Sequence, residues 1–215
     1  SAVAAALVVG YVTLFVLAMV HTGYDTGGAL LADRGRSTTA CDDRGVHHMA
    51  VRTRVELPSD APATRRVHMA AFPGPDEADL VDALRRDPAW LPDLSVVAVE
   101  DELVLAHALL TRLQVGDGWA VALAPVAVAP EWQRKGIGAQ VVRAALTAAE
   151  EAGERLVVVL GDPGYYSRFG FIPASRHEVT GPYDVQDDCF LVLPLPGYDG
   201  SPRGLCRYPA PFDAV

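Results

Sequence analysis

The chain contains no asparagine and only one lysine, Lys135, so arginine supplies nearly all of its positive charge. Cysteine is almost as rare: Cys41, Cys189 and Cys206 lie far apart, and there is no C-x-x-C pair. Because zinc ribbons and redox dithiols are built from such pairs, the spacing argues against both, and we expect no metal site. An odd, sparse set of cysteines is typical of a reducing compartment, which predicts a cytoplasmic protein.

Positive charge is outweighed along the chain. The 27 Asp and Glu residues exceed the 18 Lys and Arg residues, which gives a formal net charge of −9 at pH 7. This balance argues against nucleic acid as a partner and favours cationic substrates such as amines. With 215 residues, 50% of them hydrophobic, the chain is long enough for one domain with a sizeable core, alone or with an appendage.

Two common phosphate-binding loops are missing, and so is one nucleophile motif. No pair of glycines five apart is followed by Lys and Ser or Thr, as a Walker loop requires. A Rossmann pattern begins at Gly136 and Gly138 but meets Val141 where its third glycine should stand. The G-x-S-x-G motif is absent too, which leaves a covalent acyl-enzyme route without its usual serine.

A different glycine-containing loop is present at Gln133–Ala139, which reads QRKGIGA. It follows the apolar run Trp119–Val128 and opens the helix-like run Gly138–Glu151. A strand, such a loop and a helix in this order present unpaired backbone N–H groups at the positive end of a helix dipole, which suits a pyrophosphate. Glycine lets a phosphate approach the backbone closely, because it has no side chain.

This loop and two later blocks resemble the GNAT superfamily of acyl-CoA-dependent N-acetyltransferases. The loop fits the family pattern Gln/Arg-x-x-Gly-x-Gly/Ala after a strand. Tyr165–Phe171 resembles a later family region, with a Tyr four residues before Gly-Phe, and the tail Gly204–Phe212 resembles the ending of one bacterial subgroup of mostly unassigned substrate. The resemblance runs from about Met49 to Phe212, so we expect an N-acetyltransferase domain over residues 49–215.

Hydrophobic periodicity and turn residues predict an α/β protein with a mixed sheet. The predicted strands are Val51–Leu57, Ser95–Glu100, Leu103–Val115, Trp119–Val128, Arg155–Leu160 and, last, Asp188–Leu195. The predicted helices are Ala61–Phe72, Pro75–Arg86, Gly138–Glu151 and a short helix after Pro163. The resemblance implies a three-layer α/β/α fold in which two central strands splay apart around the cofactor. Pro125 predicts a bulge in the central strand, which either frees backbone groups for pantetheine or only kinks an edge.

The resemblance implies a binding site for acetyl-CoA, used as co-substrate. Backbone groups of Val126 and Val128 would pair with the pantetheine amides, and backbone N–H groups of the loop would hold the pyrophosphate. The cofactor-binding residues implied in this way are Val126, Ala127, Val128, Gln133, Arg134, Lys135, Gly136, Ile137, Gly138 and Ala139. The side chains of Arg134 and Lys135 would add positive charge, although a solvated surface charge explains Lys135 equally well.

Tyr166 is the predicted catalytic acid, because it aligns with the family's catalytic Tyr. A phenol with a pKa of about 10 suits the protonation of a leaving thiolate. Tyr165 is its neighbour, and in a short helix the two side chains point different ways, so only one of them can serve. A core aromatic with a satisfied hydroxyl is the alternative for either residue.

His107 is the predicted base that takes the proton from the amine, since an unperturbed histidine has a pKa of about 6.5. Many family members carry a Glu near the central strand, but Leu123, Ala124 and Pro125 occupy that stretch here. The subgroup that this chain resembles often has His at this place. A structural histidine, or a water chain in place of a single base, are the alternatives.

The resemblance implies direct transfer of an acetyl group to a primary amine of a small molecule, peptide or protein in a ternary complex. A CoA-binding sensor or partner-binding module without catalysis is the alternative. The acceptor stays open among polyamines, aminoglycosides, amino acids, peptide N-termini and protein lysines. Phe72–Trp90 and Ser175–Asp187 are predicted to shape its site, and Asp162 replaces an Asn that is common in the family.

Residues 1–48 are predicted to be an apolar segment followed by a polar linker. Ala2–Val20 contains no charged residue and has about the length, roughly 17–25 residues, that crosses a bilayer. Gly10 and Thr13 within it, and the lack of basic residues before it, argue against a membrane span. We favour a helix packed on the domain or on a second subunit in a homodimer. A membrane anchor and an extension without a catalytic role are the alternatives.

Overall fold

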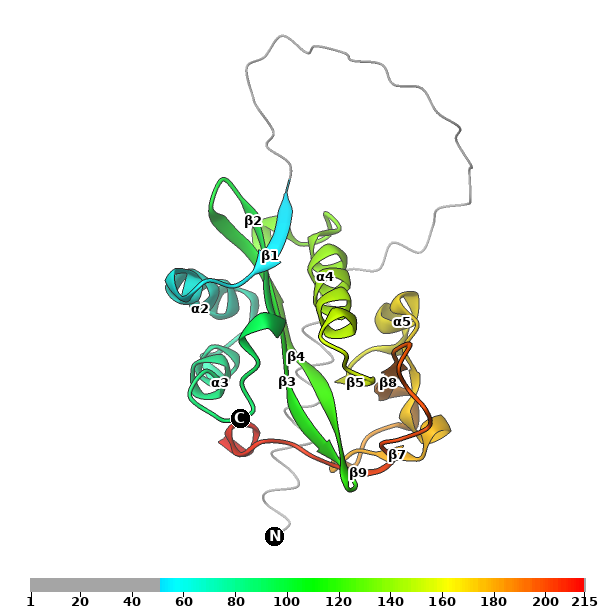
Figure 1. The fold of residues 1–215 in the computed structure, drawn as a ribbon. Coiled ribbons are helices and arrows are strands. Elements are labelled where there is room, and N and C mark those ends of the chain that lie inside the picture. The colour runs from blue at the N-terminus through cyan, green and yellow to red at the C-terminus, as the bar shows by residue number, and fades with distance from the viewer. Residues whose placement is uncertain (1–50, 215) are drawn as a thin grey trace, which may run out of the picture.

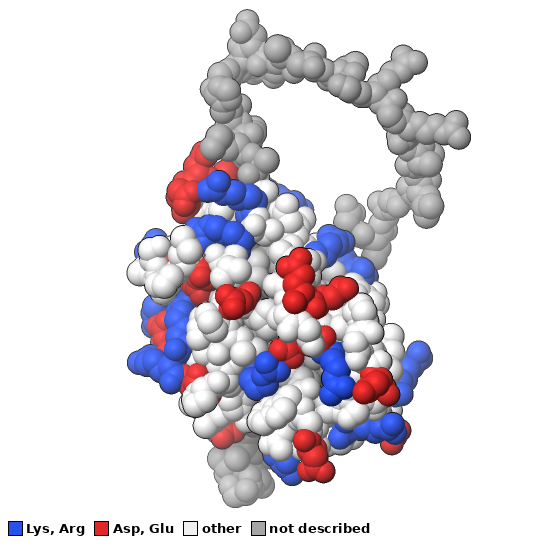
Figure 2. All heavy atoms as spheres, viewed as in Figure 1, with Lys and Arg blue, Asp and Glu red and all other residues white. Residues whose placement is uncertain are grey.

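The computed structural model describes residues 51–214, in which a mixed sheet carries helices on both faces (Figure 1). Positive and negative side chains are interspersed over the face drawn in Figure 2. The strands are β1 (Arg52–Val55), β2 (Ser95–Glu100), β3 (Leu103–Val115), β4 (Gly118–Val128), β5 (Leu156–Leu160), β6 (Ile172–Pro173), β7 (Val179–Thr180), β8 (Phe190–Pro194) and β9 (Gly204–Arg207). The helices are α2 (Ala61–Ala71), α3 (Asp76–Leu84), α4 (Ile137–Glu151) and α5 (Pro163–Tyr166). The sheet order is β1-β2-β3-β4-β5-β8-β6, with β9 paired to β3 and to β7.

Most of the predicted elements are confirmed, and the main errors are short strands. The prediction that the strand near Asp188–Leu195 is the last one is wrong, because β9 follows it and pairs with β3 at Gln114 and Val115. A strand of four residues that begins with a glycine is too short for its alternation to be recognised. The predictions for residues 1–48 and for Cys41 lie outside the described residues. Among residues 51–214, every helix is too short or too polar to cross a bilayer.

Alternate residues of β3 face opposite sides of the sheet, and this separates two groups of candidate site residues. Ala106, Ala108 and Leu110 pack in the core beneath α4. His107 and Leu109 face the other side, where they contact α2 and α3. Figure 1 shows α4 on one side of the β3–β4 pair and α2 and α3 on the other. The predicted three-layer α/β/α arrangement is therefore confirmed.

Helix α4 forms because its apolar residues recur at helical spacing. Val142, Ala145 and Ala149 are fully buried against the sheet. Gly136 caps the start of the helix with a φ of 83°, and Gly153 follows its end with a φ of 76°. Both values lie in the left-handed region that favours glycine. The helix therefore begins and ends next to positions where the sequence has a glycine.

Strands β4 and β5 run side by side for a short distance and then part. They are paired only at Val121 with Val157 and at Ala122 with Val158. β4 continues to Val128 while pairing with β3 alone, so among the described residues its edge toward β5 has no partner strand there. This is the splay that the resemblance implies.

The bulge predicted from Pro125 is confirmed. Ala108 pairs with Val126 and Leu110 with Leu123, so that one residue of β3 stands opposite two residues of β4. The extra residue lies just beyond the last pairing with β5. Since a bulge breaks the regular ladder, it changes which backbone groups of β4 face the unpaired edge.

Candidate active site

The predicted phosphate loop joins the unpaired end of β4 to the first turn of α4. Gln133 Nε2 donates a hydrogen bond of 3.1 Å to the Val128 carbonyl oxygen, which ties the loop to the strand. Arg134 has a left-handed φ of 60°, a conformation that a non-glycine residue adopts only when its surroundings impose it. A Cβ built on Gly136 would meet no atom within 4 Å, so this side of the loop is open. The first turn of α4 can therefore present its N–H groups to an anion.

Gly138, in that first turn, lies close to the side chains of Tyr165 and Val128. A Cβ built there would be 3.1 Å from the Tyr165 hydroxyl oxygen and 3.3 Å from Val128 Cγ2. Tyr165 comes from α5 and thus reaches across to the loop. Burial raises the pKa of its hydroxyl, an effect that the positive charges of Arg168 and Arg143 partly offset. The Tyr165 hydroxyl is consequently a protonated group beside the loop.

Four cations surround this region and are here called the basic cluster: Arg134, Lys135, Arg143 and Arg168. Three of them lie over aromatic rings, Lys135 at 4.7 Å from Trp132, Arg143 at 5.4 Å from Phe169 and Arg168 at 4.9 Å from Tyr165. None of the four forms a salt bridge with another residue of the described range 51–214. Their charge is therefore left for a ligand or for solvent.

Tyr166, the predicted acid, lies in the core beneath α4. Its side chain is fully buried, and its ring packs against Gly161 and Phe171. Its hydroxyl has no hydrogen-bond partner within residues 51–214. Burial raises the pKa of this hydroxyl far above its usual value, so it stays protonated. Its ring is nearly perpendicular to that of Tyr165, at 88°, and the two hydroxyls have different surroundings.

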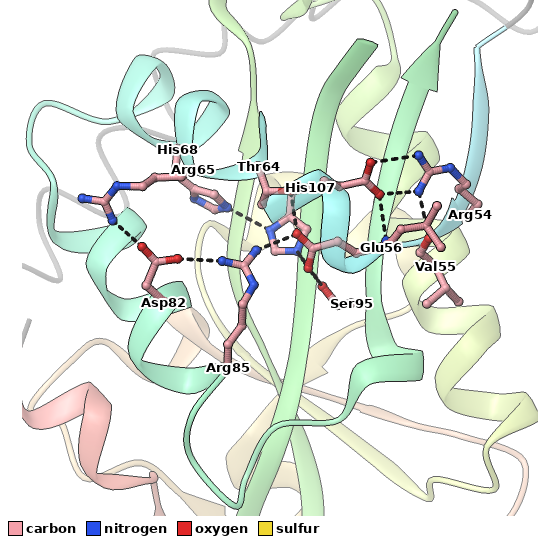
Figure 3. Close-up of polar contacts among 12 residues, drawn as sticks. Arg54, Val55, Glu56, Thr64, Arg65, His68, Asp82, Arg85, Ser95 and His107 are labelled. Carbon is pink, nitrogen blue, oxygen red and sulfur yellow. Dashed lines mark hydrogen bonds and ion pairs between the residues drawn. The ribbon is translucent and has the colours of Figure 1, made fainter. Parts of the chain in front are cut away.

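His107, the predicted base, lies on the other face of the sheet, and the structure does not bring it together with Tyr166. His107 is fully buried. Figure 3 shows its ring between His68 and Ser95. Its Nδ1 is 2.9 Å from His68 Nε2, and its Nε2 is 2.8 Å from Ser95 Oγ. Burial and the nearby charge of Arg85 lower the pKa of His107 to about 3. With both ring nitrogens occupied, His107 has no lone pair free to take a proton directly.

The contacts of His107 extend to a carboxylate that sequence reasoning missed. Ser95 Oγ donates to Glu56 at 2.6 Å, and Arg85 donates to Glu56 at 2.6 Å (Figure 3). Glu56, His68, Ser95 and His107 come from separate elements, so no local pattern marks them as a group. Arg143 and Arg168 were missed for the same reason, because α4 and the turn after α5 come together only in the fold.

The comparisons with known proteins identify the family. Residues 61–171 match the Acetyltransferase (GNAT) family. The chain belongs to the GNAT family of acetyltransferases. Two relatives in Escherichia coli strain K12 are both described as uncharacterized N-acetyltransferases. YhbS is 35% identical over 142 residues, which are 65% of this chain and 84% of YhbS. YjhQ is 33% identical over 158 residues, which are 70% of this chain and 86% of YjhQ.

Two solved structures of GNAT enzymes are similar to more than three quarters of this chain. YhbS from E. coli, in complex with CoA, has a TM-score of 0.70 and 32% identity, and the match covers 78% of this chain and 96% of YhbS. A GNAT acetyltransferase from Brucella melitensis, in complex with acetyl-CoA, has a TM-score of 0.63 and 34% identity, with 77% and 99% covered. These matches confirm the GNAT fold and the assignment of this chain as an N-acetyltransferase.

Proposed function

We propose that this GNAT acetyltransferase transfers an acetyl group from acetyl-CoA to a primary amine of a small molecule, peptide or protein, by direct attack in a ternary complex. The observation that carries the proposal is the parting of β4 and β5 beside the start of α4, where the basic cluster lacks carboxylate partners in the described chain. The two similar GNAT structures that contain CoA and acetyl-CoA support the choice of co-substrate.

The residues around the splay fit acetyl-CoA. The open loop at Gly136 and the first N–H groups of α4 suit the pyrophosphate. The edge of β4 that faces β5 suits the pantetheine amides at Val126, Ala127 and Val128, because among the described residues β4 pairs with β5 only at Val121 and Ala122. The basic cluster suits the remaining phosphate charge. When bound, acetyl-CoA supplies the thioester whose carbonyl carbon the amine attacks.

The chemistry needs a proton acceptor for the amine and a proton donor for the leaving thiolate. As the amine nitrogen forms its bond to the carbonyl carbon, the carbon–sulfur bond breaks and the sulfur takes up a proton. We assign that proton to Tyr166, because its buried hydroxyl is protonated and lacks a protein partner within residues 51–214. Buried polar groups are normally hydrogen-bonded, so an atom of the bound ligand is the simplest partner for the Tyr166 hydroxyl.

A covalent acetyl-enzyme is disfavoured by the two described cysteines. Burial raises the pKa of the Cys206 thiol to about 12. Burial also raises the pKa of Cys189, with Asp188 beside it adding to the effect. Because the thiolate is the nucleophile, neither group is activated at neutral pH. Direct attack by the amine therefore fits the available side chains better than a two-step route.

A thiol-release assay tests the function. The full chain with acetyl-CoA is offered spermidine, kanamycin, L-lysine and a short peptide with a free N-terminus, and CoA binding is measured in parallel by calorimetry. Amine-dependent thiol release, with mass spectrometry showing the acetylated product, is the expected result. Tight CoA binding without release from any amine would favour the non-catalytic alternative, and absence of CoA binding would overturn the cofactor site itself.

A further inference from the structure

The chain of polar contacts in Figure 3 begins at the carboxylate of Glu56 and ends at the imidazole of His68. Glu56, Ser95, His107 and His68 follow one another at 2.6, 2.8 and 2.9 Å. His68 Nδ1, at the end, is buried and unpartnered within residues 51–214. We propose, on the basis of the acetyltransferase function above, that His68 Nδ1 accepts the proton which the acceptor amine loses. The other three residues are positioning residues that hold His68 in the form able to do so.

The position of each hydrogen in the chain follows from its carboxylate end. Glu56 is ion-paired with Arg85 at 2.6 Å, and an ionised carboxylate can only accept hydrogen bonds. Ser95 must therefore donate its hydroxyl hydrogen to Glu56. The Ser95 oxygen is then left to accept a hydrogen bond from the Nε2–H of His107.

The same reasoning fixes both imidazole tautomers. A neutral histidine carries one ring hydrogen, so His107 with a hydrogen on Nε2 has a bare Nδ1. That nitrogen accepts from the Nε2–H of His68, and His68 is left with a bare Nδ1 as well. The end of the chain therefore presents a lone pair rather than an N–H group. Glu56 sets the tautomer of a ring that lies three hydrogen bonds away.

Several hydrogen bonds hold the Glu56 carboxylate in the position that fixes these hydrogen positions. The side chain of Glu56 is only 4% exposed, and it also accepts from Thr64 Oγ1 at 2.6 Å. Arg85, which follows α3, donates to Asp82 at 2.7 Å as well as to Glu56. These partners come from α2 and from the end of α3, so the two helices on this face hold the Glu56 carboxylate in place. A carboxylate with this many donors does not turn to release Ser95.

His68 lies on the face of the sheet where the acceptor site is predicted. The ring of Phe72 is parallel to the ring of His68 within 6°, with centroids 6.0 Å apart. Phe72 begins the segment Phe72–Trp90 that the sequence predicts to shape the acceptor site. Phe72 also belongs to the same apolar cluster as Ala127, on the bulged end of β4. An amine that enters on this side approaches β4 from the face opposite α4.

The proton transfer conserves every hydrogen. The amine N–H bond breaks and its proton passes to His68 Nδ1, directly or through one water molecule. The Nε2 hydrogen of His68 moves to His107, that of His107 moves to Ser95, and that of Ser95 moves to Glu56. One proton has entered at His68 and one has arrived on Glu56. After the product leaves, the reverse shift returns the proton to solvent.

The surroundings of His68 explain why a relay is needed. Burial lowers its pKa well below the usual value, His107 and Arg85 lower it further, and Glu56 is the group that raises it. A lasting imidazolium on either ring would thus be costly. Delivery of the proton to Glu56 neutralises a charge instead of creating one, and Arg85 keeps Asp82 as its partner.

Nuclear magnetic resonance of the full chain labelled with ¹⁵N-histidine tests the tautomers without any substrate. His68→Gln and His107→Gln variants assign the two rings. We expect both rings to be neutral, with hydrogen on Nε2, from about pH 6 to 9. Glu56→Gln should reverse both tautomers, because an amide can donate to Ser95 and start the chain in the other direction. Hydrogen on Nδ1 of His68 in the natural chain would overturn the proposal.

Kinetics of the His68→Gln variant test the proton transfer. The glutamine amide can still donate to His107 in place of Nε2, while the Nδ1 position is lost. With the fastest amine of the panel above, we expect kcat near neutral pH to fall about 100-fold, with CoA affinity unchanged. The loss should shrink as pH rises toward the amine pKa of about 10, because the free amine needs no base. Glu150→Gln, which changes an exposed side chain near the end of α4 and outside the chain of contacts, is the control.

The outcomes separate this proposal from the proposed function. A kcat within about threefold of the natural enzyme at every pH would mean that a buried water satisfies His68 Nδ1, and the proposal would be wrong. A natural enzyme that binds CoA but acetylates no amine would count against the proposed function and, with it, against any proton transfer at His68. A fall in kcat without recovery at high pH would indicate a structural defect and also contradict the proposal.

Discussion

His68 Nε2 lies 2.9 Å from His107 Nδ1, a contact that joins α2 to β3 in the interior of the protein. Both rings are kept neutral by their surroundings: the pKa of His107 is lowered to about 3 and that of His68 well below 6.5, in both cases chiefly by burial. In the unfolded chain each ring regains a pKa of about 6.5. Between about pH 3 and 6.5, the unfolded chain therefore binds more protons than the folded one.

The first prediction concerns stability and pH. Because protons bind preferentially to the unfolded chain, the free energy of unfolding should fall as pH drops below about 6.5, and these two rings should have no effect above pH 7. Each ring contributes a slope of up to about 1.4 kcal/mol per pH unit. Urea denaturation between about pH 4.5 and 8 measures this, and His107→Gln should flatten the curve. A stability independent of pH over this window would contradict the buried, neutral pair.

The second prediction concerns Ser95, which links the histidines to Glu56. Ser95→Ala removes a donor to Glu56 and an acceptor for His107, and leaves both groups buried. We expect a loss of about 1–3 kcal/mol in the free energy of unfolding, measured in urea at pH 7. Ser167→Ala, at an exposed position, should change stability by less than about 0.5 kcal/mol. Equal effects of the two substitutions would mean that the contacts of Ser95 are not formed.

The third prediction concerns Tyr166, whose hydroxyl has no partner within residues 51–214. Tyr166→Phe should leave stability and CoA affinity unchanged, because no protein hydrogen bond is lost. Amine-dependent thiol release should slow by about 100-fold if this hydroxyl protonates the leaving thiolate. Tyr165→Phe, which alters the neighbouring ring at the loop, should retain most of the rate. A full rate in Tyr166→Phe would remove this residue from the mechanism.

The long elements of this fold can be predicted from the sequence because their signal is local. The alternation along Leu103–Val115 and the spacing of Val142, Ala145 and Ala149 mark one strand and one helix without reference to the rest of the chain. β9 lacks such a signal, because four residues derive their conformation from pairing with β3. Its strand conformation is a property of the assembled sheet.

The candidate site likewise has one part with a local sequence signal and one part that forms only on folding. The loop Gln133–Ala139 is contiguous, so its pattern is visible in the sequence, and so is the Tyr pair of α5. The chain from Glu56 to His68 is not visible, because its members are brought together only when α2, α3 and the sheet pack. His107 was predicted as the base from its residue type and place. That both its ring nitrogens are occupied depends on contacts that no spacing indicates.

The fourth prediction concerns the basic cluster. Arg143→Ala and Arg168→Ala should each weaken CoA binding several-fold at low salt. Both charges lie near Tyr165, whose hydroxyl reaches Gly138 of the loop, and neither has a carboxylate partner in the described chain. Since exposed charges are screened, the loss should shrink at about 1 M salt. Calorimetry at two salt concentrations measures both. Arg155→Ala is the control and should bind CoA normally. The Arg155 side chain forms an ion pair with Asp199 at 3.0 Å, and neither residue belongs to the loop.

The last prediction tests the loop through Gly138. A Cβ at this position would already be 3.1 Å from the Tyr165 oxygen and 3.3 Å from Val128 Cγ2, so Gly138→Val must push the loop, the strand end or Tyr165 aside. We expect CoA affinity to fall at least tenfold, or about 1.4 kcal/mol, in calorimetry. Gly74→Val is the matched control, since a Cβ there meets nothing within 4 Å and its φ is not left-handed. Because that site lies between α2 and α3, the control should leave CoA binding unchanged. If Gly138→Val bound CoA as tightly as the natural chain, the diphosphate could not lie against the first turn of α4.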